Sequence, residues 1–425
     1  MTSSQADPST PRPWSAPAAS GPLEATVTIP GSKSATARAL VLAGLADTPG
    51  TIDGGLRARD TALMIEGLRS LGARIDSSGP VWTVEPLRGL TKPARIDCGL
   101  AGTVMRFLPP VAALGSGTTT FFGDAAASAR PMAGLVDALQ QLGAVVSDTR
   151  LPITVTGPIS HQTAVIDSSA SSQFISALLL TAPRMPHGLS LTHDGAAVPS
   201  APHIAMTIEA LRARGVLVEA TPRSWMVQPT EIAGIDEVIE PDLTTAAVFL
   251  AAALVAGGTV TIPHWPTQTT QPGQAILEIL TTMGGHVTRQ SDSVTVQGTG
   301  TITGIDIDLN DASELTPVVA GLAGLARSDS VIRGVGHIRG HETDRLAALS
   351  HELTSLGCRC EETADGLRVH PGPIQPGVFH THADHRLAHT AALLGLASGA
   401  VKVDDVACTS KTMPEFATVW EEMVS

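Results

Sequence analysis

Six times along this chain, a turn rich in glycine or polar residues is followed by a long run of alanine and leucine. Neighbouring turns are separated by a nearly constant 69 to 72 residues. The residues that mark the six turns are Lys33, Thr103, Ser172, Thr244, Glu314 and His385. Such a regular period predicts six copies of one folding unit. Because the residues on the turns differ between copies, we expect one scaffold to present different chemical groups at shared sites.

Aligning the six copies predicts the rest of the unit, a βαβαββ element of an α/β fold. Each turn leads into an apolar run that is too long for a buried strand and predicts a buried helix. A second helix follows, and in five copies it ends at a glycine that fits a left-handed C-cap. Two short alternating strands after each glycine predict a hairpin. The five glycines are Gly72, Gly143, Gly215, Gly284 and Gly357.

The sixth copy stops after its second helix, residues 415–423, without a glycine or a hairpin. Residues 25–30 have the pattern of the missing strand, so we expect this N-terminal strand to complete the sixth unit. The chain would then start in one domain, cross to another at Gly31 and return near Glu240. We expect a discontinuous domain of residues 22–31 plus 240–425 and a second domain of 32–239. Residues 1–21, rich in Pro, Ser and Ala, are expected to form a disordered tail.

Composition narrows the class of partner. The net charge of −13 argues against nucleic acid. No apolar stretch predicts a membrane helix, which needs about 20 residues. Four scattered cysteines predict no disulfide framework and a cytoplasmic location, and we expect a monomer. Lysine occurs only four times, yet Lys33 and Lys411 lie at repeat-phased turns, a placement that favours recruitment of a small anion.

The turns predict anion sites because a helix N-terminus offers unpaired N–H groups and a partial positive charge. Small residues there allow a ligand to approach the backbone closely. Cations converge on the same places, which suggests two phosphates, or a phosphate and a carboxylate. The candidate cations are Lys33, Arg38, Arg130, Arg345, Arg386 and Lys411.

Proton transfer would need groups among these cations. Glu314 and Glu342 lie on phased turns, and a carboxylate beside arginines stays ionised and can act as a base. His341 and His385 are further candidates near neutral pH. No Walker or dinucleotide-binding fingerprint follows any predicted strand.

Simpler interpretations compete with several of these assignments. The run Ser168–Ser172 could be only a helix cap, and Asp384 an ordinary N-cap. Glu342 and Arg345, three residues apart on a helix, could be a surface salt bridge. A cluster of histidines resembles a metal site but lacks a recognisable zinc spacing, so we expect no metal. The cluster is His380, His382, His385 and His389.

The turns resemble those of the 5-enolpyruvylshikimate-3-phosphate synthase family, from about residue 22 to 423. Each motif alone is modestly specific, whereas seven in order are very specific. The motifs are Pro30–Arg38, Ala101–Arg106, Asp124 with Arg130–Met132, Ser171–Phe174, Glu342–Leu346, Asp384–Arg386 and Lys411–Pro414. The resemblance implies a two-domain inside-out α/β barrel, three units to a domain, with the active cleft between the domains. Two crossovers also imply an open-to-closed hinge near residues 31 and 240.

The resemblance implies transfer of the enolpyruvyl group of phosphoenolpyruvate to the 5-hydroxyl of shikimate 3-phosphate, with release of phosphate and without metal or organic cofactor. It assigns shikimate 3-phosphate to Lys33, Ser34, Arg38, Ser171, Ser172, Gln173, Ser200, Glu314 and His341. It assigns phosphoenolpyruvate to Lys33, Gly102, Arg130, Gln173, Arg345, Arg386 and Lys411. It assigns catalysis to Glu314, Glu342, Lys33 and His385. Gly102 matches a position where a small residue leaves room for glyphosate, so inhibition by glyphosate is predicted.

The sequence departs from the family's commonest pattern at five positions. Leu100 and His337 each replace an asparagine, Glu314 an aspartate, His341 a lysine and His203 a tyrosine. Glutamate keeps the acid–base chemistry of aspartate, so Glu314 remains the expected base. Histidine, unlike lysine, changes charge near neutral pH, so we predict a pH optimum that depends on His341.

Two alternatives stay open. A related transferase acting on a UDP-sugar carries a reactive cysteine on a first-domain loop and an asparagine after its first lysine. Here Ser34 follows Lys33, and the loop from Asp124 to Arg130 has no cysteine. The other alternative is a non-catalytic anion-binding paralogue, which is weakened by the joint presence of the candidate catalytic residues.

Overall fold

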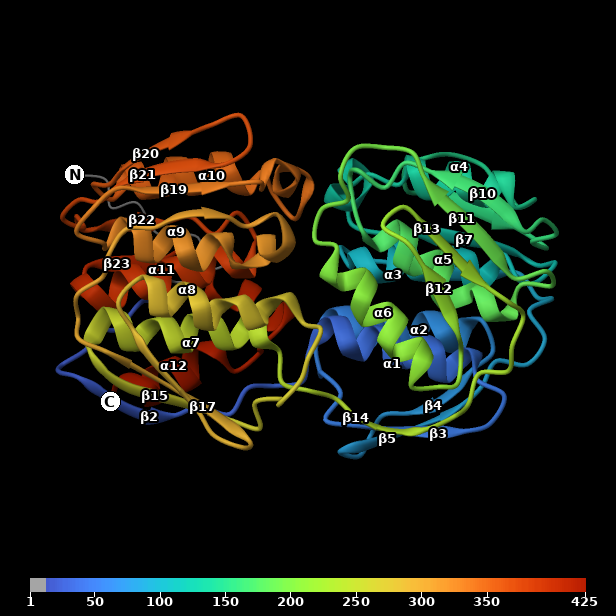
Figure 1. Ribbon diagram of the computed structural model, residues 1–425, viewed down its shortest axis with the longest axis horizontal. Helices are drawn as coiled ribbons and strands as arrows, with labels where there is room; N and C mark the ends of the chain where they lie inside the picture. Colours follow the sequence, from blue (N-terminus) through green and yellow to red (C-terminus); the bar gives the residue numbers. More distant parts are fainter. Residues whose placement is uncertain (1–12) are drawn as a thin grey trace, which may run out of the picture. The chain divides into compact units, whose positions relative to one another are not determined.

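The computed structural model describes residues 13–425, and they divide into two compact units. Unit 1 contains the described residues up to 29, together with 244–267 and 275–425. Unit 2 contains residues 30–243 and 268–274. Each unit is built from three copies of the repeat (Figure 1).

Unit 2 places its three first helices inside and its sheets outside (Figure 1). Helices α1 (Lys33–Leu45), α3 (Gly102–Ala112) and α5 (Gln173–Thr181) contact one another, and nearly all their residues are buried. The second helices are α2 (Arg59–Ser70), α4 (Ala133–Gln141) and α6 (Pro202–Arg212). Burial on every side explains why the first helices are apolar all round.

Three four-stranded sheets cover unit 2. The first has the order β14 (Asp236–Val238), β3 (Gly50–Asp53), β5 (Val81–Glu85) and β4 (Arg74–Asp76). The second is β6 (Ala94–Asp97), β7 (Thr118–Phe122), β9 (Ile153–Thr156) and β8 (Val145–Val146). The third is β10 (Thr163–Ile166), β11 (Leu189–His193), β13 (Ser224–Val227) and β12 (Val218–Ala220). Unit 2 also contains two short 3-10 helices, η1 (Ala125–Ala129) and η2 (Ala182–Arg184).

Unit 1 repeats the arrangement with α7 (Leu243–Ala256), α9 (Thr316–Gly324) and α11 (His385–Ser398) as first helices. The second helices are α8 (Ile276–Thr282), α10 (Arg345–Ser355) and α12 (Phe416–Val424). The 3-10 helices η4 (Asn310–Leu315), η5 (Gly336–Gly340) and η6 (Val406–Lys411) precede helices of this unit. The 3-10 helix η3 (Pro272–Ala275), which precedes α8, lies mostly in the 268–274 segment of unit 2. One sheet is β16 (His286–Arg289), β17 (Ser293–Gly298), β15 (Gly258–Pro263) and β2 (Leu23–Thr26). The second is β18 (Asp306–Asp308), β19 (Ser330–Arg333), β21 (Leu367–His370) and β20 (Arg359–Glu362). The third is β1 (Trp14–Ser15), β23 (Val401–Val403) and β22 (Gly377–Phe379).

The predicted repeat is confirmed in its local detail. All six apolar runs form first helices, and all five hairpins pair antiparallel. The five glycines expected to end second helices have φ between +81° and +110°, a region that residues with a Cβ atom disfavour. The helix stops could therefore be predicted because they depend on one residue each.

The expected partner of the N-terminal strand was wrong. Strand β2 pairs parallel with β15 in the fourth copy, and β14 pairs with β3 in the first copy, so these two copies exchange strands. The sixth copy is instead completed by β1, where Trp14 pairs antiparallel with Val403. The expected disorder was thus wrong for residues 13–21, while residues 1–12 lie outside the described chain. Alternation shows that a segment is a strand but carries little information about its partner.

The segments around Gly31 and Glu240 lie side by side in unit 2. Gly31 and Pro241 form an isolated bridge, Ser32 N donates to Glu240 O at 2.8 Å, and Asp242 N donates to Pro30 O at 2.9 Å. A Cβ on Gly31 would lie 2.0 Å from Gly54 O. This approach of two backbones requires glycine and fixes the start of α1.

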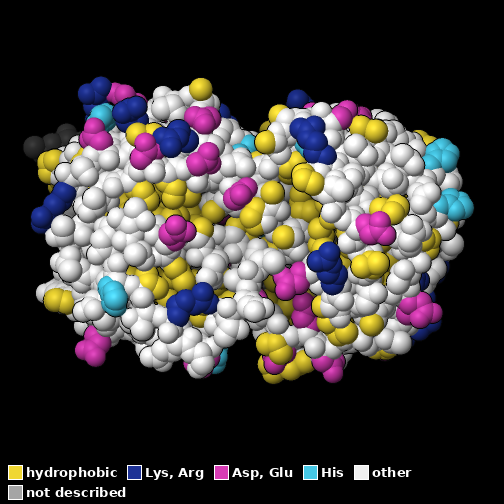
Figure 2. Space-filling view, in the orientation of Figure 1, with side chains coloured by type: hydrophobic (Ala, Val, Ile, Leu, Met, Phe, Trp, Pro, Cys, Tyr) yellow, Lys and Arg dark blue, Asp and Glu magenta, His cyan; other side chains and the backbone are white. Residues whose placement is uncertain are grey.

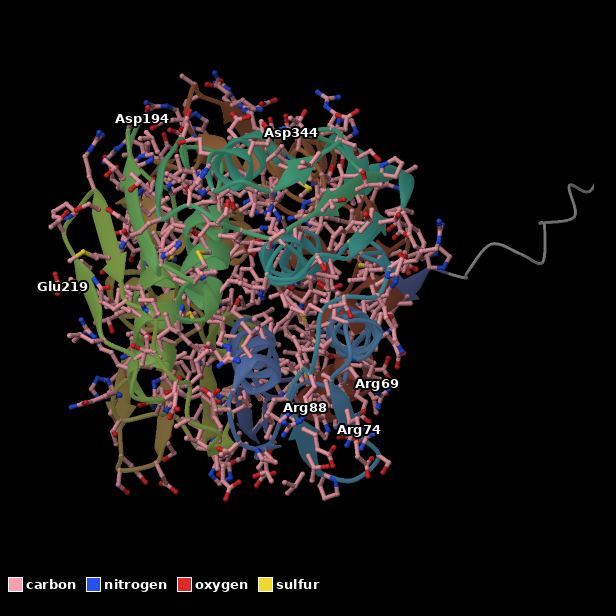
Figure 3. All side chains as sticks on the ribbon, turned by 90° about the vertical axis from the view of Figure 1, so that its right-hand side faces the viewer. Arg69, Arg74, Arg88, Asp194, Glu219 and Asp344 are labelled. Atoms are coloured by element: carbon pink, nitrogen blue, oxygen red, sulfur yellow. The ribbon has the colours of Figure 1, made fainter. Side chains whose placement is uncertain are left out.

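Charged side chains of both signs are interspersed on the face of each unit shown in Figure 2, and some of opposite sign adjoin at the upper left. At the periphery of unit 2, Figure 3 labels Arg74 on the edge strand β4 and Glu219 on the edge strand β12. Charges on edge strands discourage pairing with another chain. Within residues 13–425, no helix is long and apolar enough to span a membrane.

Candidate active site

Arg345 is the centre of a buried charged cluster in unit 1. It is the first residue of α10 and is 0% exposed. Its Nε donates to Asp384 Oδ2 at 2.7 Å, its Nη2 to Glu342 Oε2 at 3.0 Å and its Nη1 to Glu314 Oε2 at 2.9 Å. Burial alone would lower the pKa of this guanidinium, but the three carboxylates raise it well above its ordinary value. One buried cation thus holds three carboxylates, so the pair with Glu342 is no surface salt bridge.

Glu314 is the most exposed carboxylate of this cluster, with 28% of its side chain accessible. Burial would raise its pKa, but the charge on Arg345 and the contact with His341 outweigh burial, so the pKa lies well below its ordinary value. His341 Nδ1 lies 3.3 Å from Glu314 Oε1 and 3.0 Å from Arg345 Nη1. That nitrogen can accept from Arg345 when unprotonated or donate to Glu314 when protonated, but not both. The lysine-to-histidine departure therefore keeps a contact with the carboxylate but makes it depend on protonation.

His337, the replacement for an asparagine, lies next to this carboxylate. Its Nε2 is 2.9 Å from Ser313 Oγ. Burial, and after it the charge on His341, lowers the pKa of His337 to about 4. The imidazole is therefore neutral near pH 7, like the amide it replaces.

Glu342 is enclosed between two cations. Its Oε1 lies 2.5 Å from Lys411 Nζ, its Oε2 accepts from Arg345, and only 7% of its side chain is exposed. Lys411 is the last residue of η6 and is 12% exposed. These two cations hold the Glu342 carboxylate in a fixed position, where it is a candidate for proton transfer.

Asp384 joins the cluster to the start of α11. It caps the helix by accepting from Arg386 N at 2.9 Å, so the N-cap interpretation holds alongside its bond to Arg345. The two preceding residues, His382 and Ala383, have φ of 52° and 56°. His385 Nδ1 lies 3.6 Å from Asp384 Oδ1. Among the described residues, buried Arg386 Nη1 has no hydrogen-bond partner, which leaves a donor for a ligand.

In unit 2, Lys33 begins α1 at the crossing segment. Its backbone N donates to Asp242 Oδ2 at 3.1 Å, and its Nζ lies 3.6 Å from Asp60 Oδ2. Ser32 caps the helix by accepting from Ala35 N at 3.3 Å. The ammonium is therefore held near one carboxylate at a helix N-terminus, where a phosphate would be attracted.

Arg38, a candidate cation on α1, lies inside unit 2. It is only 2% exposed and donates to neutral acceptors, namely Thr207 Oγ1 at 2.8 Å, His203 O at 2.9 Å and Ser34 O at 2.9 Å. Burial lowers its pKa to about 9. Ser200, with φ of 51°, lies one turn from His203 and accepts from its N at 3.1 Å. Arg38 in this structure therefore positions the backbone of the turns around Ser34 and Ser200.

The Arg130 guanidinium lies where a side chain at Gly102 would be, in unit 2. Arg130, 7% exposed, donates from Nη1 to Leu100 O at 2.9 Å. A Cβ on Gly102 would lie 2.9 Å from Arg130 Nη2 and 3.1 Å from Cζ. The missing side chain at Gly102 therefore creates room for the guanidinium. Because the contact at Leu100 is made by its carbonyl, the asparagine-to-leucine departure leaves it intact.

The serine turn of the third copy is held by Arg106. Its Nη1 donates to Gln173 Oε1 at 2.8 Å and lies 3.4 Å from Ser171 Oγ. Ser168 Oγ donates to Ser171 O at 2.6 Å, so part of the run is a local turn. The simpler interpretation expected a helix cap, but the N-cap residue Ser172 makes no side-chain cap hydrogen bond. Since Arg106 takes the amide oxygen of Gln173, the amide NH₂ group is directed elsewhere. Ser172 is 5% exposed and precedes α5.

Several residues that contact the candidate site residues were not predicted from the sequence to do so. Arg106 lies inside a recognised motif, and Asp384 was weighed chiefly as a cap. Asp60 and Asp242 support Lys33. The repeat could have indicated Asp60, which lies 71 residues before Pro131, in phase with the second-helix starts.

The histidine cluster does not form a metal site in the described part of the chain, where no group of three or more His, Cys, Asp and Glu could hold a metal. His380 lies 3.1 Å from Asp404, and His382 lies 3.0 Å from Glu352. His389 is buried and stacks on Phe416. These side chains therefore have separate structural contacts.

The fold is that of enolpyruvyl transferases. The structure of EPSP synthase from Acinetobacter baumannii matches with a TM-score of 0.79 at 21% identity, covering 97% of this chain and 98% of that one. The enolpyruvyl transferase NikO from Streptomyces tendae matches with a TM-score of 0.74 at 18% identity, covering 96% of each chain. These likenesses confirm the expected two-domain enolpyruvyl transferase-like fold.

Sequence comparisons identify the family. The EPSP synthase (3-phosphoshikimate 1-carboxyvinyltransferase) model matches residues 17–420. A 3-phosphoshikimate 1-carboxyvinyltransferase of Mycobacterium ulcerans (strain Agy99) is 51% identical over 421 residues, covering 97% of this chain and 98% of the relative. The chain therefore belongs to the EPSP synthase family, as its motifs indicated.

Proposed function

We propose that this chain transfers the enolpyruvyl group of phosphoenolpyruvate to the 5-hydroxyl of shikimate 3-phosphate, giving 5-enolpyruvylshikimate 3-phosphate and phosphate. Family membership over nearly the whole length supports this reaction. The structural observation that carries it is the cluster around Arg345. Two carboxylates, Glu314 and Glu342, are there held beside Lys411 and Arg386. The chemistry needs both bases and anion-binding cations.

The anionic groups of the substrates would be divided between the candidate residues. For phosphoenolpyruvate we propose Arg386, whose Nη1 lacks a partner among the described residues, and Lys411. In unit 2 we propose Lys33, Arg130 beside Gly102, and the amide of Gln173. Shikimate 3-phosphate would be bound by hydroxyls, amides and the cation at the turns of unit 2, with Glu314 and His341 from unit 1. The unit 2 set is Lys33, Ser34, Ser171, Ser172, Gln173 and Ser200, with Arg38 holding the turns from within.

The reaction would proceed by addition and elimination. In the addition, the 5-hydroxyl oxygen bonds to C2 of phosphoenolpyruvate, its proton passes to Glu314, and C3 gains a proton. In the elimination, C3 loses a proton and the C2–O bond to phosphate breaks, which restores the double bond. We propose that Glu342, in its protonated form, gives C3 its proton in the addition and takes a proton back from C3 in the elimination, with Lys33 and His385 as the groups that assist. Glu314 is in the form that can accept a proton, because its pKa lies well below its ordinary value and it is ionised at neutral pH.

Phosphate release tests this function directly. Purified protein with phosphoenolpyruvate and shikimate 3-phosphate should release phosphate, and Lys33→Ala should abolish release. Release with a UDP-sugar in place of shikimate 3-phosphate would instead support the related transferase, and no release with either acceptor would support a non-catalytic paralogue. Added glyphosate should inhibit the wild type.

Location and assembly are separate proposals. All four cysteines are free, and three of them are buried. Reduced thiols favour a cytoplasmic location, and we propose that the enzyme works there as a monomer. Size-exclusion chromatography coupled to light scattering tests the second point.

A further inference from the structure

A cavity in unit 2 is lined by α2, by the residues just before it, and by Ser77 and Trp82 of the β4–β5 hairpin. Its volume is about 350 Å³, within the range of small-molecule sites. Its apolar wall includes Leu56, Ile65 and Trp82, and its polar wall includes Arg57, Arg59 and Arg69. Glu66 is the one carboxylate among its lining residues. An apolar wall with an excess of arginines fits a small anion with a hydrophobic body.

Arg57 is the best anchor for such an anion. Its Nη1 donates to Ser77 O at 2.9 Å and its Nη2 to Gly79 O, both on the β4–β5 hairpin. Its guanidinium lies over the Trp82 ring at 5.6 Å from the centroid. Within residues 13–425, no carboxylate forms an ion pair with Arg57, so its charge is fixed in place but not neutralised.

The other arginines of the wall have partners that a ligand can replace. Arg59 forms a two-pronged pair with Asp124, both contacts at 2.9 Å, but the two side chains are 57% and 41% exposed. Arg69 pairs with Glu66, and Figure 3 labels it on the same outer side of unit 2 as Arg74. Exposed pairs of this kind are weak. The wall also carries the Trp82 Nε1 donor, which is buried and lacks a partner in the part of the chain that is described.

We propose that this cavity binds a small monocyclic carboxylate and that the bound ligand slows the enzyme through the first turn of α2. A planar carboxylate matches the planar fork of a guanidinium, and one ring fits the volume. The volume and the apolar residues favour a ring over a longer chain.

The first turn of α2 links the cavity to the candidate active site. Arg59 holds Asp124, which precedes η1 and the loop to Arg130. The next residue, Asp60, lies 3.6 Å from Lys33 Nζ. A carboxylate that draws Arg59 into the cavity releases Asp124 and moves the residue beside Lys33. The expected consequence is a higher apparent KM for phosphoenolpyruvate.

Binding is measured with 4-fluorobenzoate as the probe, followed by its ¹⁹F NMR signal in the presence of full-length protein. Saturating phosphoenolpyruvate and shikimate 3-phosphate are added in a parallel sample to occupy the candidate active site. We expect saturable binding that the substrates weaken only by a limited factor, set by the same coupling that raises the KM for phosphoenolpyruvate. We also expect about tenfold weaker binding in Arg57→Gln because a charged hydrogen-bond donor is lost. Arg74→Gln is the matched control, since Arg74 is an exposed arginine of the same unit outside the cavity, and it should bind as the wild type does.

Several results would overturn the proposal. An apparent Kd of the probe that keeps rising with substrate concentration would place it in the active site, because a coupled separate site reaches a limit. Equal binding by wild type and Arg57→Gln would exclude the cavity. The coupling is tested by phosphate release, where the probe should raise the KM for phosphoenolpyruvate in the wild type but not in Arg57→Gln. Binding without any change in rate would refute the coupling. The rate test rests on the proposed function, whereas the ¹⁹F test does not, so the two failures can be told apart.

Discussion

Gly102→Ala should weaken phosphoenolpyruvate binding without unfolding the protein. The added methyl would lie 2.9 Å from Arg130 Nη2 and 3.1 Å from both Cζ and Nη1, closer than side chains normally approach. The guanidinium is the far end of a flexible side chain, so it can yield by a few tenths of an ångström. We therefore expect a cost in unfolding free energy below about 1 kcal/mol.

The cost to binding should be larger because the displaced group is a charged donor. A hydrogen bond to a charged group contributes about 1.5–3 kcal/mol. Its loss corresponds to a decrease of roughly 10- to 150-fold in kcat/KM for phosphoenolpyruvate. The KM for shikimate 3-phosphate should change little. Initial rates of phosphate release, with each substrate varied in turn, give both numbers.

A double-mutant cycle tests whether Arg130 carries the effect. Arg130→Lys removes the planar guanidinium, so Gly102→Ala should add little in that background. Gly79→Ala is the matched control, since its new methyl would meet only Val81 O at 3.7 Å. If Gly102→Ala lowers kcat/KM by the same factor in the wild type and in Arg130→Lys, the displacement of Arg130 is not the cause of the decrease.

Three further predictions follow from single contacts. The pKa of Glu314 lies well below its ordinary 4.5, so in acid the unfolded chain binds more protons than the folded chain. The free energy of unfolding should therefore fall as the pH drops below about 4.5. Glu314→Gln should reduce this dependence of the unfolding free energy on pH, measured by urea titrations at several pH values. His341→Lys should broaden the pH–rate profile toward alkaline pH, and profiles equal to wild type would remove His341 from the pH response. Trp14 Nε1 donates to Glu421 at 2.6 Å and its ring meets Phe416, so Trp14→Ala should cost about 1–2 kcal/mol in the unfolding of unit 1; an unchanged unfolding midpoint would contradict this.

The features predicted well from sequence depend on neighbours along the chain. The apolar runs become α1, α3, α5, α7, α9 and α11, and a positive φ at each stop glycine follows from the lack of a Cβ. The exchange of β2 and β14 between copies could not be predicted, because both strands have the same alternating pattern. Only the three-dimensional arrangement decides which sheet each one joins.

The candidate site was predictable as a set of residues but not as a set of contacts. Phase along the repeat indicated Arg345, Glu314 and Lys411 as candidates, and in the structure they lie in one cluster. Phase could not show that Arg38 would be buried among neutral acceptors, whereas Arg386 would keep an unpaired donor within the described chain. Packing between copies decides which cations are buried. A buried cation whose donors are taken by the protein positions neighbouring residues instead of binding a ligand.

Arg345 is the sharpest case of that distinction. All three of its guanidinium nitrogens already contact carboxylates, and the side chain is fully buried, so binding phosphoenolpyruvate would require it to release one of them. If it instead positions Glu314, Arg345→Lys should keep a positive charge but lose the fork that holds three partners. The lysine charge would no longer be held against Glu314, so the pKa of Glu314 would rise and the acid limb of the rate profile should move to higher pH as kcat falls. A direct contact with phosphoenolpyruvate predicts the opposite division, a raised KM with the pH profile unchanged, and that result would return Arg345 to the binding set.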